Sequence, residues 1–82
     1  METIVLNDKN NGIPNEFIDK LLTDHPRYKT GQIIEFNGGY YGNLRFQTNI
    51  IGFDEDGGIY VNWTSYWFPI KDEPDRNIEA FI

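Results

Sequence analysis

Cysteine is absent from this chain of 82 residues, which also has one histidine and one methionine. Without cysteine, a disulfide framework and thiolate chemistry are both excluded. Basic residues are scarce, since seven Lys and Arg stand against thirteen Asp and Glu, and they are scattered along the chain. A phosphate-binding surface needs clustered Lys and Arg, so we expect no direct binding of nucleic acid.

Long apolar runs are missing as well, and those present are far too short to cross a bilayer. The first 25 residues lack a basic start followed by an apolar stretch, which is the pattern of a secretory signal. We therefore expect a cytoplasmic protein that does not bind membranes.

Catalytic motifs are also lacking. His25 comes just before Pro26, at the end of a predicted helix, where the helix dipole favours a cation. The sequence has no serine motif, phosphate-cradling glycine loop or metal-ligand spacing, and Asp54–Gly57 lacks the rest of an EF-hand loop. We expect a protein that is not an enzyme and that needs neither cofactor nor metal.

The chain does have aromatic side chains, at 16% of its residues, and a succession of short β-prone runs. A single domain of this length has a thin core, which large side chains help to fill. From Gly31 to Ile82, glycine turns separate the runs, a layout that predicts a small five-stranded barrel. The runs are Gly31–Phe36, two strands in Thr48–Trp63 around an acidic turn, Ser65–Ile70 and Asn77–Ile82, with Asn37–Phe46 as a long irregular loop.

The N-terminal part has a different pattern. Glu2–Leu6 is a short β-prone run, and Asn15–His25 carries an apolar stripe at helical spacing that ends before Pro26. The predicted fold is therefore α+β. It is one domain over residues 1–82, with a strand and a helix in residues 1–26 packed on the five-stranded barrel in residues 31–82.

Three segments carry a resemblance to a known family: Gly31–Ile34, the turn Asp54–Gly57, and Ile59–Trp63 with its Ile-x-Val-x-Trp pattern. In these segments the chain resembles the small SH3-like barrels of the DUF4314 type, which occur in bacteria and often in phages and other mobile elements. The family's Pro-Gly-Thr-x-Gly is replaced here by Leu44–Thr48. The resemblance implies a fold and an origin, but no catalytic residues.

Exposed aromatic residues form the first candidate site. Tyr40 and Tyr41 fall in the long loop, and Trp67 is predicted to point away from the core, with Tyr66 beside it. Such side chains offer a large rigid contact area with a polar tip, which suits a protein interface. The alternative is that some of them cover the thin core.

Two acidic turns form the second candidate site. One contains Asp54, Glu55 and Asp56, and the other contains Asp72, Glu73 and Asp75. If both turns lie at one end of the barrel, they form a negative patch that would steer a basic protein surface into contact. The alternative is that these are ordinary solvated turns.

These patterns favour a non-enzymatic binding protein with a basic protein partner. The sharper hypothesis is a phage or mobile-element accessory protein that binds and occludes a basic host or defence protein. A first alternative is a binder of a small molecule or nucleotide, with Arg45 and Lys71 as phosphate partners. A second is a homo-oligomeric structural module.

Overall fold

The computed structural model describes residues 2–6, 14–39, 41–62 and 69–81. The described part is mostly strands with one short helix, in agreement with the α+β prediction. The elements in chain order are β1 (Thr3–Val5), α1 (Asn15–Asp19), β2 (Ile33–Gly38), β3 (Leu44–Phe53), β4 (Ile59–Val61), the 3₁₀ turn η1 (Pro74–Arg76) and β5 (Glu79–Ala80).

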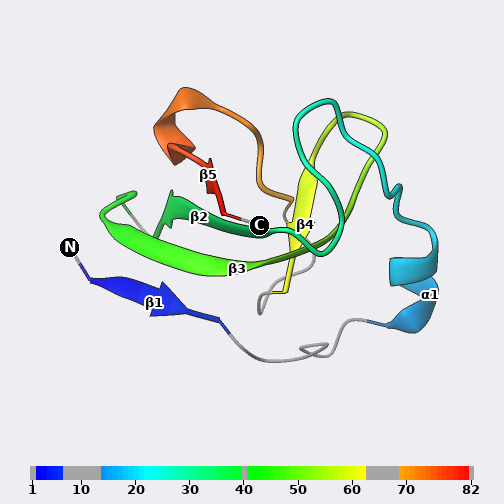
Figure 1. Cartoon of the computed structure of the whole chain (residues 1–82), viewed down its shortest axis with the longest axis horizontal. Helices are drawn as coiled ribbons and strands as arrows, with labels where there is room; N and C mark the ends of the chain where they lie inside the picture. The colour runs from blue at the N-terminus through cyan, green and yellow to red at the C-terminus, as the bar shows by residue number, and fades with distance from the viewer. Residues whose placement is uncertain (1, 7–13, 40, 63–68, 82) are drawn as a thin grey trace.

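The long strand β3 organises the sheet (Figure 1). Its first half pairs antiparallel with β2, from Gly38 opposite Leu44 to Ile33 opposite Asn49. Along the other edge of β3, β1 pairs in parallel near the start of the strand and β4 pairs antiparallel near its end. The strand β5 pairs antiparallel with β2, which gives the order β1-β3-β2-β5 with β4 also on β3.

The core lies on one face of this sheet, and the alternation of side chains explains its composition. In β2 the side chains of Ile34 and Phe36 are fully buried, while those of the intervening residues are only partly buried. Phe36 lies opposite Phe46 in β3, and their ring centroids are 5.8 Å apart. The buried apolar residues are Tyr28, Ile34, Phe36, Phe46, Ile50, Phe53, Ile59, Val61 and Ile70.

The sheet is open, so the predicted barrel is not shown. Among the described residues, β1 and β5 are its two ends and do not pair with each other. The fifth strand also differs from the prediction, because β1 completes the sheet beside β3 instead of lying outside it. Most of the predicted strand Ser65–Ile70 falls outside the described residues, and Ile70 forms a bridge with Ile59.

The helix is shorter than the predicted Asn15–His25, because α1 ends at Asp19. Beyond it, the backbone of Leu22 pairs with that of Phe53, with N–H to oxygen distances of 2.8 and 2.9 Å in the two directions. A helix of three turns gains little stability by itself, so pairing with the end of β3 outweighs it. The apolar stripe still docks: the ring of Phe17 contacts that of Tyr60 at 5.2 Å between centroids.

The hairpin loop predicted over Asn37–Phe46 is present but shorter than expected, since β2 continues to Gly38 and β3 begins at Leu44. The connection occupies residues 39–43, where Gly39 and Gly42 both have positive φ. Two such positions allow a tight reversal that other residues would make only under strain. The second acidic turn contains the 3₁₀ turn η1.

In the part of the chain that the structure describes, no helix has the length and apolar character needed to cross a membrane.

Candidate functional site

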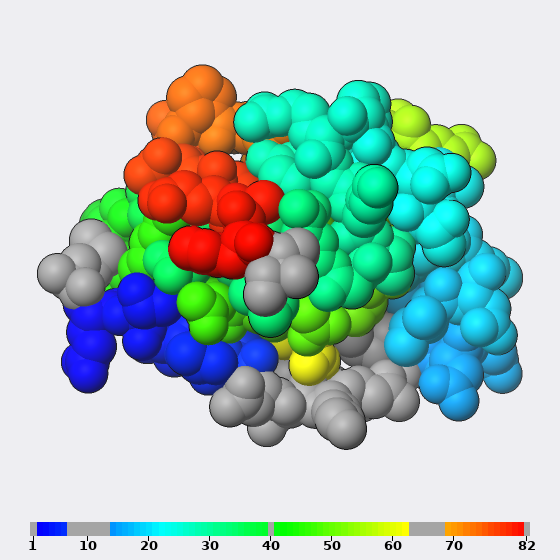
Figure 2. All heavy atoms as spheres, in the orientation of Figure 1, coloured from blue at the N-terminus to red at the C-terminus, as the bar shows by residue number. Residues whose placement is uncertain are grey.

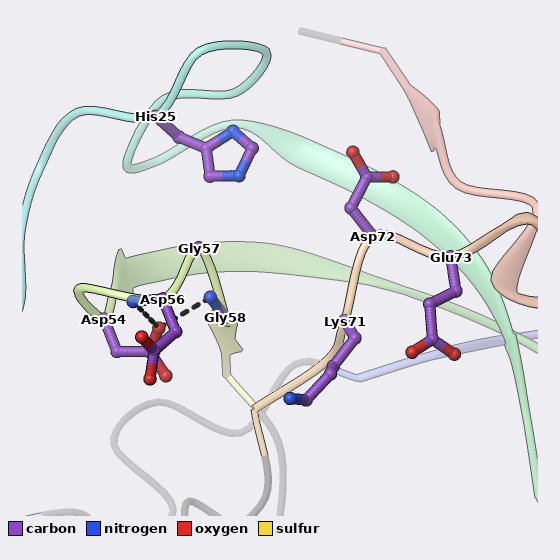
Figure 3. Close-up of a pocket in the computed structure, with 8 residues that line it drawn as sticks. All are labelled: His25, Asp54, Asp56, Gly57, Gly58, Lys71, Asp72 and Glu73. Carbon is purple, nitrogen blue, oxygen red and sulfur yellow. Dashed lines mark hydrogen bonds between the residues drawn. The ribbon is translucent and has the colours of Figure 1, made fainter.

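The two acidic turns face each other across a hollow of about 340 Å³ (Figure 3). Asp54 and Asp56 come from the turn between β3 and β4, and Asp72 and Glu73 come from the segment that leads to η1. The hollow is lined by His25, Asp54, Asp56, Gly57, Gly58, Lys71, Asp72 and Glu73. Four carboxylates therefore meet one lysine, which gives this hollow a net negative charge at neutral pH.

The first turn is held by the side chain of Asp54. Its Oδ1 accepts hydrogen bonds from the backbone N–H groups of Asp56 at 2.9 Å and Gly58 at 2.7 Å (Figure 3). Gly57 has a φ of +84°, a conformation that glycine adopts without strain. A Cβ at Gly58 would lie 2.5 Å from Oδ2 of Asp54, so this position also has no room for a side chain. Asp54 thus builds the turn, whereas Asp56 lies exposed beside it.

The second acidic turn forms the other wall of the hollow, and its start is fixed by the bridge between Ile70 and Ile59. The backbone N–H of each residue donates to the carbonyl oxygen of the other, at 2.7 and 2.8 Å. Asp72 and Glu73 then point in opposite directions (Figure 3). The carboxylate of Asp72 accepts from the guanidinium of Arg27 at 2.7 Å and from the hydroxyl of Tyr28 at 3.5 Å. This ion pair ties residues 27–28 to the second acidic wall.

His25 closes the hollow from a third segment. Its Nδ1 accepts a hydrogen bond from the backbone N–H of Arg27 at 3.1 Å. Its ring lies between those of Phe53 and Tyr28, with centroid distances of 4.9 and 5.3 Å. The predicted role of His25 at a helix end is therefore wrong, because α1 ends before this residue.

A second hollow, of about 470 Å³, continues from the first at Glu73, which lines both. It lies between the β2–β3 connection and η1, and Tyr41, Asp75 and Arg76 line it. The side chain of Tyr41 is 84% exposed. We call the combined surface of Tyr41, Asp54, Asp56, Asp72, Glu73 and Asp75 the acidic face. In Figure 2, η1 and the turn between β3 and β4 both lie along the upper rim of the molecule.

Two tyrosines near the acidic face have a raised pKa. For Tyr28, burial is the main cause and the charge of Asp72 adds to it, while Arg27 acts in the opposite direction. For Tyr60, burial again raises the pKa, and Asp54 contributes. Both hydroxyls therefore remain protonated at neutral pH, so that Tyr28 can donate to Asp72.

The predicted site residues divide into groups. The structure brings Asp54, Asp56, Asp72 and Glu73 together at one hollow, and it places Asp75 and Tyr41 at the adjoining one. Glu55 is separate, since it lines a hollow with Phe17 and Leu21 beside α1. Tyr40, Tyr66 and Trp67 lie outside the described residues.

Arg45, a predicted phosphate partner, is buried in the fold with only 8% of its surface exposed. Its guanidinium donates to Glu35 at 3.2 Å, to Glu79 at 2.8 Å and to Asn37 at 2.9 Å. It also donates to the backbone oxygen of Asn77 at 2.8 Å. These partners occupy the guanidinium, which leaves Lys71 at the first hollow as the other named phosphate partner.

Within the described ranges, no group of His, Asp and Glu side chains has an arrangement suited to holding a metal ion. The acidic face instead offers separated carboxylates and one exposed phenol, which can contact a cationic surface. Sequence reasoning missed His25 and Lys71 as parts of this surface. No local sequence pattern predicts that His25 and Lys71 belong to this surface, because residues 25, 54–58 and 71–73 come together only in the folded chain.

We expect Asp54→Ala to lower the free energy of unfolding by about 1–2 kcal/mol, because two backbone N–H groups lose their acceptor. Asp56→Asn, in the same turn, should change it by less than about 0.5 kcal/mol because its side chain is exposed. Urea unfolding followed by tryptophan fluorescence would measure both variants. Equal effects of the two substitutions would contradict the structural role of Asp54.

No family model, curated protein or solved structure matches the chain.

Proposed function

We propose that this chain is a non-enzymatic binding protein that contacts a basic surface of another protein through its acidic face. The observation that carries the proposal is the meeting of two acidic turns, far apart in sequence, at one hollow. Glu73 continues this surface to Asp75 and to the exposed ring of Tyr41. Aromatic side chains among charged residues suit a protein interface. In such an interface the aromatic ring anchors the contact, and the charged groups steer the partner toward it.

The sharper form of the proposal depends on the DUF4314 resemblance. In that form the chain is an SH3-like barrel and a cytoplasmic accessory protein of a phage or mobile element, and it occludes a basic host or defence protein. The antiparallel run of β2, β3 and β4 around an aromatic core supports the fold part of this proposal. The net charge of −6 supports a basic partner.

A nucleotide-binding function has less support. Of the two cations named for it, Arg45 is buried among Glu35, Glu79 and Asn37. Lys71 lines a hollow with four carboxylates, which would repel a phosphate. An anionic ligand would therefore meet an unfavourable field at this surface.

The test is a charge-removing triple variant, Asp56→Asn, Glu73→Gln and Asp75→Asn, which spares Asp54 and its turn. A matched control, Glu2→Gln, Glu16→Gln and Asp19→Asn, removes the same charge from exposed residues outside the acidic face. Binding of a synthetic oligolysine peptide would be measured by fluorescence anisotropy at low and high salt. Pull-downs from a bacterial lysate with the same variants would then look for a natural partner.

We expect the acidic-face variant to bind the peptide about tenfold more weakly, from three losses of roughly 0.5 kcal/mol each. The control should bind within about twofold of wild type, and high salt should reduce the difference between them. If the two triple variants lose affinity equally, only net charge matters and the acidic face is not the binding surface. Self-association in sedimentation experiments, with no peptide binding, would favour the homo-oligomeric alternative.

A further inference from the structure

His25 occupies a position at the acidic face in which its protonation state matters. The Nδ1 atom accepts the N–H of Arg27 at 3.1 Å, and an imidazole can accept at Nδ1 only while that nitrogen carries no proton. The Nε2 atom faces the turn between β3 and β4, since a Cβ at Gly57 would lie 3.8 Å from it. The ring is held on Phe53 and Tyr28, so it has little freedom to turn away.

Charged and titratable groups of each neighbouring segment line the same hollow as the imidazole. Asp54 and Asp56 lie on the turn, and Lys71, Asp72 and Glu73 lie on the segment before η1 (Figure 3). On its own segment, Arg27 and Tyr28 follow it, and both contact Asp72. The imidazole therefore shares one hollow with both acidic turns.

Adding a proton to His25 would change this arrangement in two ways. Both ring nitrogens would become donors, so the N–H of Arg27 would lose its acceptor. The side chain of the same residue, Arg27, forms a 2.7 Å ion pair with Asp72, so the backbone that would change carries a contact to the second acidic turn. In addition, the hollow would gain a positive charge, and a basic partner would meet a less negative surface.

We propose that His25 is a proton-sensitive switch in the acidic face, and that its protonation weakens the binding of a basic partner. Imidazole is the side chain that ordinarily changes charge between about pH 5 and pH 8. Aspartate and glutamate side chains ordinarily titrate near pH 4, below the range in which an imidazole ordinarily changes charge. The proposal rests on the proposed function for its effect on binding, but the local change at Arg27 is independent of any partner.

The experiment has two parts. In the first, NMR follows the His25 ring protons and the Arg27 amide of the wild-type protein from about pH 8 to about pH 5. In the second, binding of the oligolysine peptide is compared at about pH 7.5 and about pH 5.5 in wild type and in His25→Asn. Asparagine places an oxygen near the position of Nδ1, so it retains an acceptor for Arg27 but cannot gain a proton.

We expect the Arg27 amide to shift with the same midpoint as the His25 ring, and peptide affinity to fall roughly threefold on acidification in wild type but not in His25→Asn. An Arg27 amide that does not respond to titration of His25 would overturn the switch. So would an affinity that is unchanged or higher at the lower pH, or a fall that persists in His25→Asn. If the peptide fails to bind at either pH, the proposed function fails, and the Arg27 amide still decides whether the local change occurs.

Discussion

Arg45→Met should lower the free energy of unfolding by about 3 kcal/mol or more, the largest effect that we expect from one substitution in this chain. The side chains of Arg45 and Glu35 are only 10% and 18% exposed, and their ion pair has an N–O distance of 3.2 Å. Removing the guanidinium leaves the carboxylate of Glu35 largely buried, with the side-chain amide of Gln47 still donating to it at 3.2 Å. Breaking a buried pair from one side is costly because the other charge is stranded.

Urea unfolding of Arg45→Met, with Glu79→Gln as the control, would measure this effect. Glu79 also pairs with Arg45, but its side chain is 58% exposed, so water replaces the lost interaction and the cost should be below about 1 kcal/mol. Adding Glu35→Gln to Arg45→Met should recover part of the stability, because it removes the stranded charge. A loss below about 1 kcal/mol for Arg45→Met would show that the ion pairs and hydrogen bonds of Arg45 contribute little to the stability of the fold.

Gly52→Val should lower the free energy of unfolding by about 2–3 kcal/mol. The cause is a clash that separates the segment of Leu21 and Leu22 from the end of β3. A Cβ at Gly52 would lie 2.5 Å from the Cβ of Leu21 and 2.9 Å from its Cδ1. The Cβ of Leu21 is fixed to the backbone, so the whole segment must shift, and the neighbouring pairing of Leu22 with Phe53 would be strained.

Hydrogen exchange would distinguish this local effect from general unfolding. In Gly52→Val, the amides of Leu22 and Phe53, which bond to each other's carbonyl groups, should lose protection more than the amides of β2. Ile51→Val is a suitable control, since it changes a partly buried neighbour by one methylene and should cost less than about 1.5 kcal/mol. Uniform loss of protection across β2 and β3 would argue against local undocking.

Local patterns predicted those features that depend on neighbours in sequence. A strand in the Gly31–Phe36 run and an acidic turn between two strands both followed from the local residue pattern, and both are present. The helix was predicted too long because Leu21 and Leu22 fit a helical stripe, whereas in the fold they contact Gly52 and Phe53. Such tertiary contacts override a weak local preference.

The candidate site was predictable only in part, for the same reason. The composition of the two acidic turns is evident in the sequence, but whether the turns lie together depends on the fold. The structure brings Asp54, Asp56, Asp72 and Glu73 to one hollow. The separation of Glu55 follows from its place in the turn on the side of α1. The burial of Arg45 could not be foreseen, because its partners Glu35, Asn37 and Glu79 come together through strand register.

The parallel pairing of β1 with β3 has a consequence for the order of folding. Thr3 lies opposite Arg45, so this contact joins residues far apart in sequence, whereas β2, β3 and β4 follow one another through short connections. Contacts that close long loops form slowly, so β1 should join after β2, β3 and β4 have paired. Until it does, the edge of β3 that β1 covers remains open, and a newly made chain passes through a stage in which this edge can pair with the strand of another molecule.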